Sequence, residues 1–203
     1  MIPVKICGIT SRKDACAAIS HGVQALGFVM APSLRQVTAA TVREITAHIS
    51  PLVIKVGVFV NEDPWVIKEL LRDCRLDLAQ LHGEETPEDC EILAGRVIKT
   101  FKAGQDLPDP VWKEARLRGI LIDTYSATAC GGTGQTWDWS LVAAYRSLGW
   151  PLILAGGLNA ANIGAAIHQV HPDGLDLSSG VEVQPGVKDE KKISELMQVI
   201  NGL

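Results

Sequence analysis

The amino-acid sequence predicts an α/β fold, a single (β/α)8 TIM barrel formed by residues 1–203, and three observations support this prediction. First, short apolar runs typical of strands alternate with segments of helical spacing along the whole chain. Second, such alternation requires a parallel sheet with right-handed crossovers, and eight units close into a barrel better than they form an open sheet. Third, the length of 203 residues lies near the lower limit for this barrel, which leaves room for few insertions.

The first four units are regular. We predict strands at 3–7, 25–29, 53–60 and 76–81, and helices at 11–22, around 42–45, at 64–71 and at 86–95. Ser11 and Thr86 are suited to cap the first and fourth helices, and Pro64 suits the first turn of the third. Gly22 and Gly95 end the first and fourth helices.

The last four units are less regular. We predict strands at 97–101, 119–123, 151–155 and 174–177, a weaker helix through Trp112 and Leu117, and a helix at 141–148. A long loop rich in glycine and threonine separates the sixth strand from the helix at 141–148. Loops of this length are usually functional or disordered. The last two strands are each followed by a glycine-containing loop and a helix.

The composition excludes several classes of protein. Hydrophobic residues make up 47% and charged residues 21% of the chain, which is typical of a globular domain and not of a disordered one. The net charge of -4 offers no basic surface to a nucleic acid. The N-terminus lacks the features of a secretory signal and no apolar run reaches membrane-spanning length, so we expect a cytoplasmic protein without a membrane partner. The five cysteines lack the spacing of a zinc site, and we predict reduced thiols and no metal site.

The ends of the strands supply the candidates for catalysis, because the active site of such barrels lies at the C-terminal ends of the strands. Cys7 ends the first strand and Asp123 ends the sixth. These two strands are not neighbours in a closed barrel of eight, so a substrate would lie between the thiol and the carboxyl group, as proton transfer at two separate atoms requires. We predict that Cys7 is a general base and Asp123 its acid partner. The alternative for Cys7 is a small buried hydrophobic residue.

Lys5 shares a strand face with Cys7, because side chains alternate along a strand. A positive charge there would lower the pKa of the thiol from its ordinary value of about 8.5. The alternative is an ion pair between Lys5 and Asp176 inside the barrel, and both interpretations are compatible.

Three glycine-rich segments occur in the last units, at 131–134, 155–158 and 178–181. Glycine lets backbone N–H groups approach a phosphate closely, and the loops after strands seven and eight are the common phosphate site of this barrel. We predict a phosphate site that includes Gly132, Thr133, Gly156, Gly157, Ser179 and Gly180. The alternative is that these glycines serve turns that need positive φ.

Taken together, the motifs resemble the phosphoribosylanthranilate isomerase family. They are Lys5-Ile6-Cys7-Gly8-Ile9-Thr10, Gln80-Leu81-His82-Gly83-Glu84, Gly131-Gly132-Thr133-Gly134, Ala155-Gly156-Gly157-Leu158, Asp176-Leu177-Ser178-Ser179-Gly180-Val181-Glu182 and Pro185-Gly186-Val187-Lys188-Asp189. The resemblance implies a small phosphoribosyl substrate and no metal or organic cofactor. The implied reaction is the Amadori rearrangement of N-(5-phosphoribosyl)anthranilate to 1-(2-carboxyphenylamino)-1-deoxyribulose 5-phosphate in tryptophan biosynthesis.

The resemblance also implies roles for individual residues. The aspartate matching Asp123 protonates the furanose ring oxygen and opens the ring to a Schiff base, and the cysteine matching Cys7 then removes the C2 proton. Arg35 would face the anthranilate carboxylate, with an ordinary loop arginine as the alternative. Asp176 would stabilise the cationic intermediate.

Other interpretations remain open from the sequence. Gln80 and His82 line the mouth of the barrel, either as substrate contacts or as a satisfied core pair. The chain is a monomer or a homodimer. Another phosphosugar isomerase on the same barrel is a rival, although the histidine-pathway isomerase family carries an aspartate where this chain has Cys7. A barrel that binds a phosphate ligand without catalysis is a second rival.

Overall fold

The computed structural model describes residues 2–104, 108–124 and 139–203. In these ranges, eight parallel strands close into a barrel in the order β1 to β8, and β8 pairs with β1. The barrel strands are β1 Val4–Cys7, β2 Ala25–Val29, β3 Ile54–Phe59, β4 Leu78–Leu81, β5 Val97–Lys102, β6 Leu117–Asp123, β7 Leu152–Ala155 and β8 Gly174–Leu177. The predicted (β/α)8 barrel is confirmed.

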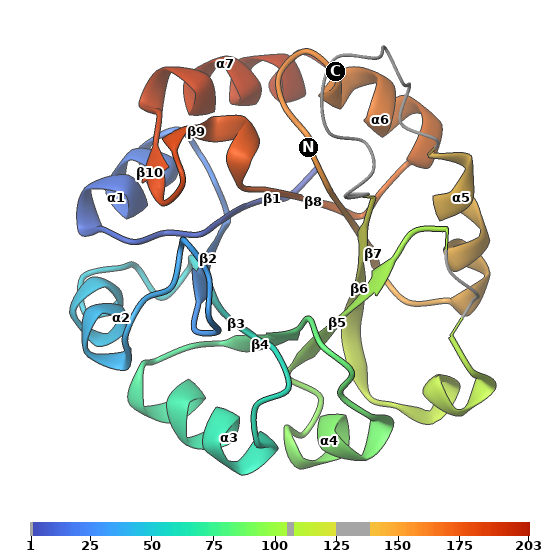
Figure 1. Ribbon diagram of the computed structural model, residues 1–203. Coiled ribbons are helices and arrows are strands. Elements are labelled where there is room, and N and C mark those ends of the chain that lie inside the picture. Colours follow the sequence, from blue (N-terminus) through green and yellow to red (C-terminus); the bar gives the residue numbers. More distant parts are fainter. Residues whose placement is uncertain (1, 105–107, 125–138) are drawn as a thin grey trace.

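The helices form an outer ring around the strands (Figure 1). They are α1 Arg12–Ser20, α2 Ala39–Thr46, α3 Pro64–Asp73, α4 Pro87–Ile92, α5 Ser140–Ala143, α6 Ile163–Val170 and α7 Glu190–Asn201. The predicted caps are confirmed: the Ser11 side chain accepts a hydrogen bond at the start of α1, and Thr86 forms a capping box at the start of α4. None of the helices in the described ranges is long and apolar enough to cross a membrane.

Two parts of the helix prediction are wrong. Trp112 lies in a short 3-10 helix, Pro110–Glu114, and Leu117 begins β6, so no helix runs through both. Leu117 pairs with Val97 of β5, which shows that sheet pairing overrides the weak local preference for a helix. The predicted helix at 141–148 consists of α5 followed by the 3-10 helix Ala144–Leu148.

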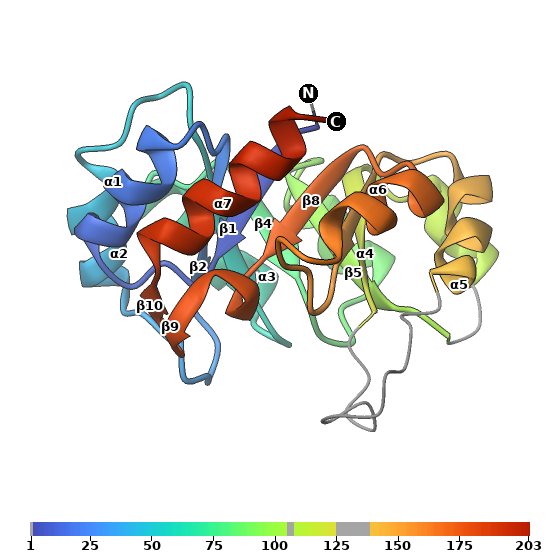
Figure 2. The same cartoon turned by 90° about the horizontal axis from the view of Figure 1, so that it is seen from above.

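A small hairpin follows β8 and was not predicted. After the 3-10 helix Ser179–Val181, strands β9 Glu182–Gln184 and β10 Val187–Lys188 pair antiparallel. Figures 1 and 2 show this hairpin beside α1 and α7. The Thr10 hydroxyl donates a hydrogen bond of 2.5 Å to the carbonyl oxygen of Gly186 in the turn, where φ is 81°. The hairpin is thereby joined to the loop after β1.

The barrel interior changes from apolar to polar toward the C-terminal ends of the strands. A small apolar cluster inside the barrel consists of Val56, Ile98, Leu121 and Ala155. Val4 and Ile6 of β1 instead join the larger core between strands and helices. Lys5 and Cys7 therefore point inward, as the alternation of side chains predicts.

Candidate active site

A cavity of about 550 Å³ lies at the C-terminal ends of the strands and contains most of the predicted site. Among its lining residues are Cys7, Arg35, Gln80, His82, Asp123, Gly156, Gly157, Asp176 and Ser179. Gly180 is not among them, and its role in phosphate binding stays a prediction. A Cβ atom at Gly180 would collide with the carbonyl oxygen of Leu158, so glycine is needed where the loops after β7 and β8 meet. Gly132, Thr133 and the long loop after β6 lie outside the described residues.

Cys7 is buried beside an ion pair. Lys5 Nζ donates to Asp176 Oδ1 at 2.8 Å, which confirms the predicted pair. Burial raises the pKa of the Cys7 thiol above its ordinary value, and the Lys5 ammonium only partly offsets this effect. Lys5 lowers the thiol pKa, as expected, but the net shift is upward. Burial is the largest effect, and the Asp176 carboxylate, which also faces the thiol, adds to the rise.

Asp123 faces Cys7 from another part of the barrel. It ends β6, whose neighbours are β5 and β7, and its carboxylate lies on the same cavity as the thiol. Asp123 Oδ2 lies 3.7 Å from Nε2 of His82. Burial lowers the pKa of His82, and the charge of Asp123 opposes this shift only in part, which favours a neutral imidazole.

Gln80 and His82 form a pair on the cavity wall. Gln80 Nε2 lies 3.4 Å from His82 Nδ1. Because an amide nitrogen can only donate, this contact is a hydrogen bond in the tautomer that has its ring proton on Nε2, the nitrogen that faces Asp123. The Gln80 amide oxygen is buried and has no hydrogen-bond partner among the described residues. His82 thus links Gln80 to Asp123, the predicted general acid. The Gln80 amide oxygen can still accept a hydrogen bond.

The structure adds two residues that sequence reasoning did not place in the site, Glu182 and Lys188. Arg35 Nη2 donates to Glu182 Oε2 at 2.6 Å, and Lys188 Nζ donates to Glu182 Oε1 at 2.7 Å. These hydrogen bonds outweigh burial and lower the pKa of Glu182 to about 2. Arg35 therefore lies on the wall of the cavity and is paired with Glu182, and its contact with a substrate stays a prediction. The sequence did contain an indication that these residues matter, because Glu182 belongs to the family motif at 176–182 and Lys188 to the motif at 185–189.

Two glycines after β7 have turn geometry. Gly156 and Gly157 have φ values of 97° and 61°, which glycine adopts without strain. The turn interpretation is thus confirmed for these two residues. It is compatible with phosphate binding, because both glycines line the cavity and a glycine turn lets a ligand approach the backbone closely.

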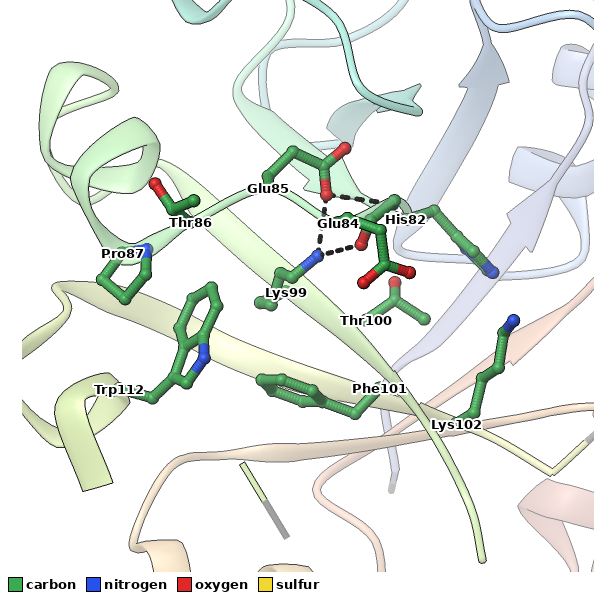
Figure 3. A pocket seen from close by; sticks show the side chains of 11 residues that line it. His82, Glu84, Glu85, Thr86, Pro87, Lys99, Thr100, Phe101, Lys102 and Trp112 are labelled. Atoms are coloured by element: carbon green, nitrogen blue, oxygen red, sulfur yellow. Dashed lines mark hydrogen bonds and ion pairs between the residues drawn. The ribbon is translucent and has the colours of Figure 1, made fainter. Parts of the chain in front are cut away.

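A second cavity of about 330 Å³ adjoins the first, with His82 on the wall of both. Figure 3 shows Glu85 and Lys99 pointing toward each other in this second cavity. Lys99 Nζ lies 2.7 Å from Glu85 Oε2 and donates to the carbonyl oxygen of Gly83 at 2.6 Å. Both charged side chains are buried and compensate each other. This pair joins the loop after β4 to β5 and thereby supports the position of His82.

We expect Lys99→Met to destabilise the protein by about 3–5 kcal/mol, because it leaves the Glu85 carboxylate buried and unpaired. Although burial opposes the shift, the hydrogen bonds from Lys99 and the backbone lower the pKa of Glu85. The stabilisation by Glu85 is therefore present above the ordinary glutamate pKa and is lost as the pH falls through the lowered value. Urea unfolding at neutral and acidic pH measures the difference, which should shrink at acidic pH. Lys102→Met, an exposed change on the same strand, is the control, and equal stability of both variants would contradict the role of the pair.

The fold and the cavity define a class of protein. A (β/α)8 barrel with a thiol and a carboxylate on non-adjacent strands, and with glycine turns at the ends of its last strands, has the architecture of an aldose-ketose isomerase acting on a phosphorylated sugar. Residues 4–199 match the family model described as N-(5'phosphoribosyl)anthranilate (PRA) isomerase. The chain belongs to this family.

Individual relatives agree with the family assignment over the full chain. An N-(5'-phosphoribosyl)anthranilate isomerase of Pseudomonas putida (strain GB-1) is 47% identical over 199 residues, which cover 97% of this chain and 96% of the relative. The crystal structure of phosphoribosyl anthranilate isomerase from Thermotoga maritima is similar with a TM-score of 0.86 and 40% identity, and covers 100% of both chains. A further structure, in complex with reduced 1-(o-carboxyphenylamino)-1-deoxyribulose 5-phosphate, has a TM-score of 0.83 and 38% identity over 100% of both chains.

Proposed function

We propose that this isomerase converts N-(5'-phosphoribosyl)anthranilate by an Amadori rearrangement in the cavity at the strand ends, with Asp123 as general acid and Cys7 as general base. One observation carries the assignment of roles. The two groups end strands that are not neighbours in the barrel, yet both line the same cavity. A substrate between them can exchange protons at two different atoms without either group moving.

The first step opens the sugar ring. Asp123 gives its proton to the furanose ring oxygen, the C1–O bond breaks, and the anilino nitrogen supplies the electron pair that forms a protonated Schiff base. The resulting cation lies near Asp176, whose buried carboxylate can stabilise a positive charge. The neutral imidazole of His82 faces Asp123 and adds no competing positive charge.

The second step is carried by the thiolate of Cys7, which removes the proton from C2. The C2–H electrons form the C1–C2 double bond, and the iminium electrons return to nitrogen. The enolamine then becomes the ketone by moving a proton from the C2 hydroxyl to C1. Cys7 then holds the proton from C2 and Asp123 has lost one, and return of this proton from the thiol to the Asp123 carboxylate restores both groups and balances the reaction.

The two charged groups of the substrate have candidate partners among the residues that line the cavity. The ligand in the related complex carries a carboxyphenyl group and a 5-phosphate. In this chain, Arg35 offers a guanidinium on one wall, and the glycine turn at 156–157 with Ser179 offers backbone N–H groups on another. We propose that the carboxylate binds at Arg35 and the phosphate at the loops after β7 and β8, with Gly132, Thr133 and Gly180 completing the phosphate site.

Growth of a bacterial tryptophan auxotroph that lacks this isomerase tests the function directly. We expect the chain to restore growth without tryptophan. The matched control is the Cys7→Ala variant expressed at the same level, which should not restore growth. Failure of the well-expressed wild-type chain would contradict the proposed reaction.

The pH dependence of kcat/KM tests how the two groups share a proton. The productive form has a thiolate at Cys7 and a protonated carboxyl at Asp123, so it holds one proton on the pair. Loss of this proton inactivates the site, and burial raises the pKa of the Cys7 thiol. We expect kcat/KM to fall as the pH rises through this raised pKa. A rate that keeps rising beyond it would show that the thiolate works without the proton of Asp123.

We infer that the isomerase works in the cytoplasm on a small phosphoribosyl compound and is a monomer or a homodimer. Its biosynthetic family supports the location, and its net charge of -4 argues against a nucleic-acid partner. Cell fractionation and light scattering of the purified chain test these two inferences.

A further inference from the structure

We propose that Glu182 and Lys188 of the β9–β10 hairpin are positioning residues, which hold Arg35 and the end of the Cys7 strand in the arrangement that the reaction needs. This inference rests on the proposed function and deepens it. The hairpin is an addition to the eight strand-helix units, and neither residue belongs to a strand of the barrel.

Lys188 reaches from the hairpin to the catalytic strand. Its side chain is fully buried, with 0% exposed, and Nζ donates to the carbonyl oxygen of Cys7 at 2.5 Å. Burial of an ammonium is costly unless the charge is paired and hydrogen-bonded, and Glu182 provides that pairing at 2.7 Å. The contact fixes the peptide group that follows the thiol and so fixes the direction in which the thiol points.

Glu182 holds Arg35 at two nitrogen atoms. Arg35 Nε donates to Oε1 at 2.9 Å and Nη2 donates to Oε2 at 2.6 Å, which is the forked geometry of a strong charge-assisted pair. Glu182 also accepts a hydrogen bond of 3.2 Å from the backbone nitrogen of Gly186. The side chain of Glu182 is only 4% exposed, so its position is set by these contacts and not by solvent.

The stem of Arg35 lies directly over the residue that follows the thiol. A Cβ atom at Gly8 would lie 2.5 Å from Arg35 Cδ, so only glycine allows this approach. Arg35 is thus packed against the end of β1 and held from the other side by Glu182. A shift of the carboxylate would move the guanidinium and the Cys7 strand together.

The net charge of Arg35, Glu182 and Lys188 indicates an anionic ligand. Arg35 and Lys188 are cations and Glu182 is an anion, so the three side chains carry one positive charge in excess. Arg35 is the most exposed of the three, at 23%, and lines the cavity. The excess charge is therefore available to an anionic group of the substrate, and the anthranilate carboxylate is the anion that the reaction brings to this wall.

The test compares two substrates in the Glu182→Gln variant, which keeps the size of the side chain and removes its charge. One is N-(5'-phosphoribosyl)anthranilate, and the other is the corresponding phosphoribosyl aniline without the carboxylate. We expect KM for the first to rise about 10- to 100-fold, the loss typical of a hydrogen bond to a charged group. KM for the second should change much less. A general loss of structure would raise both values alike and would overturn the proposal.

Lys188→Met tests the second contact. Because Arg35 keeps its pair with Glu182, we expect the main effect on kcat, which should fall at least 10-fold through misplacement of the thiol. Lys188→Arg should restore part of the loss. Lys191→Met, an exposed lysine change on α7, is the control and should match the wild type. Equal kcat in Lys188→Met and the wild type would overturn the role of Lys188.

A further variant and a wild-type measurement keep the proposal falsifiable. If Glu182→Gln does not fold, Glu182→Asp is tested instead, because it keeps the negative charge on a side chain that is shorter by one methylene. We expect the same difference in KM between the two substrates. Wild-type turnover is measured first. A wild-type chain that does not isomerise refutes the proposed function, whereas an active wild type with unchanged variants refutes only the role of the hairpin.

Discussion

Cys7→Ala will bind the substrate but convert it about 10² to 10⁴ times more slowly than the wild type, the usual contribution of a general base. In the proposed mechanism the thiol removes the C2 proton, and its loss leaves the Lys5–Asp176 pair and Arg35 in place. Steady-state kinetics give kcat, and calorimetry with a reduced product analogue gives the affinity, which should stay within a few-fold of the wild type.

Cys16→Ala is the matched control, because Cys16 is an exposed cysteine on α1 away from the cavity. It should be as active as the wild type. A barrel that binds a phosphate ligand without catalysis predicts the opposite pattern, with no difference between Cys7→Ala and Cys16→Ala. That outcome would favour the alternative that Cys7 is only a small buried hydrophobic residue.

Asp123→Asn will slow the reaction by a comparable factor, about 10² to 10⁴, because an amide cannot protonate the ring oxygen. The two losses differ in the step that becomes slow. In Asp123→Asn ring opening limits the rate, so deuterium at C2 of the substrate should no longer slow turnover. Any wild-type isotope effect from removal of the C2 proton should therefore disappear in this variant.

Asp73→Asn provides the control for the carboxyl group, because Asp73 lies at the exposed end of α3, where it pairs with Arg72. It should keep both the rate and the isotope effect of the wild type. An undiminished rate in Asp123→Asn would assign the acid to another group. A full isotope effect in a slowed Asp123→Asn would place this residue in the C2 step and not in ring opening.

The parts of the fold that sequence reasoning predicted are those set by local patterns. The strand Val4–Cys7 follows from its alternating faces, and the starts of α1 and α4 follow from Ser11 and Thr86. The Lys5–Asp176 pair was an expectation of the closed barrel, since both residues point into its interior. Cys7 and Asp123 share a cavity for the same reason.

The parts that were missed depend on tertiary contacts. Arg35 and Glu182 are separated by 147 positions, and nothing in either local segment indicates the pairing. The strands β9 and β10 are too short to give a periodic signal. The net rise in the pKa of Cys7 depends on how deeply the folded barrel buries the thiol, which a residue pattern does not contain. Leu117 shows the same limit, because its pairing with Val97 decides its conformation.

The closure of the barrel by β1 and β8 has a consequence for how the protein is made. The Cys7 carbonyl oxygen accepts a hydrogen bond from a lysine 181 positions further along, so the ribosome exposes the Cys7 thiol long before it delivers this lysine. Until residues 174–177 emerge, β1 has an unpaired edge, which is open to wrong pairing in the nascent chain. A chain that stops before these residues therefore carries Cys7 without the strand and the lysine that hold it in place.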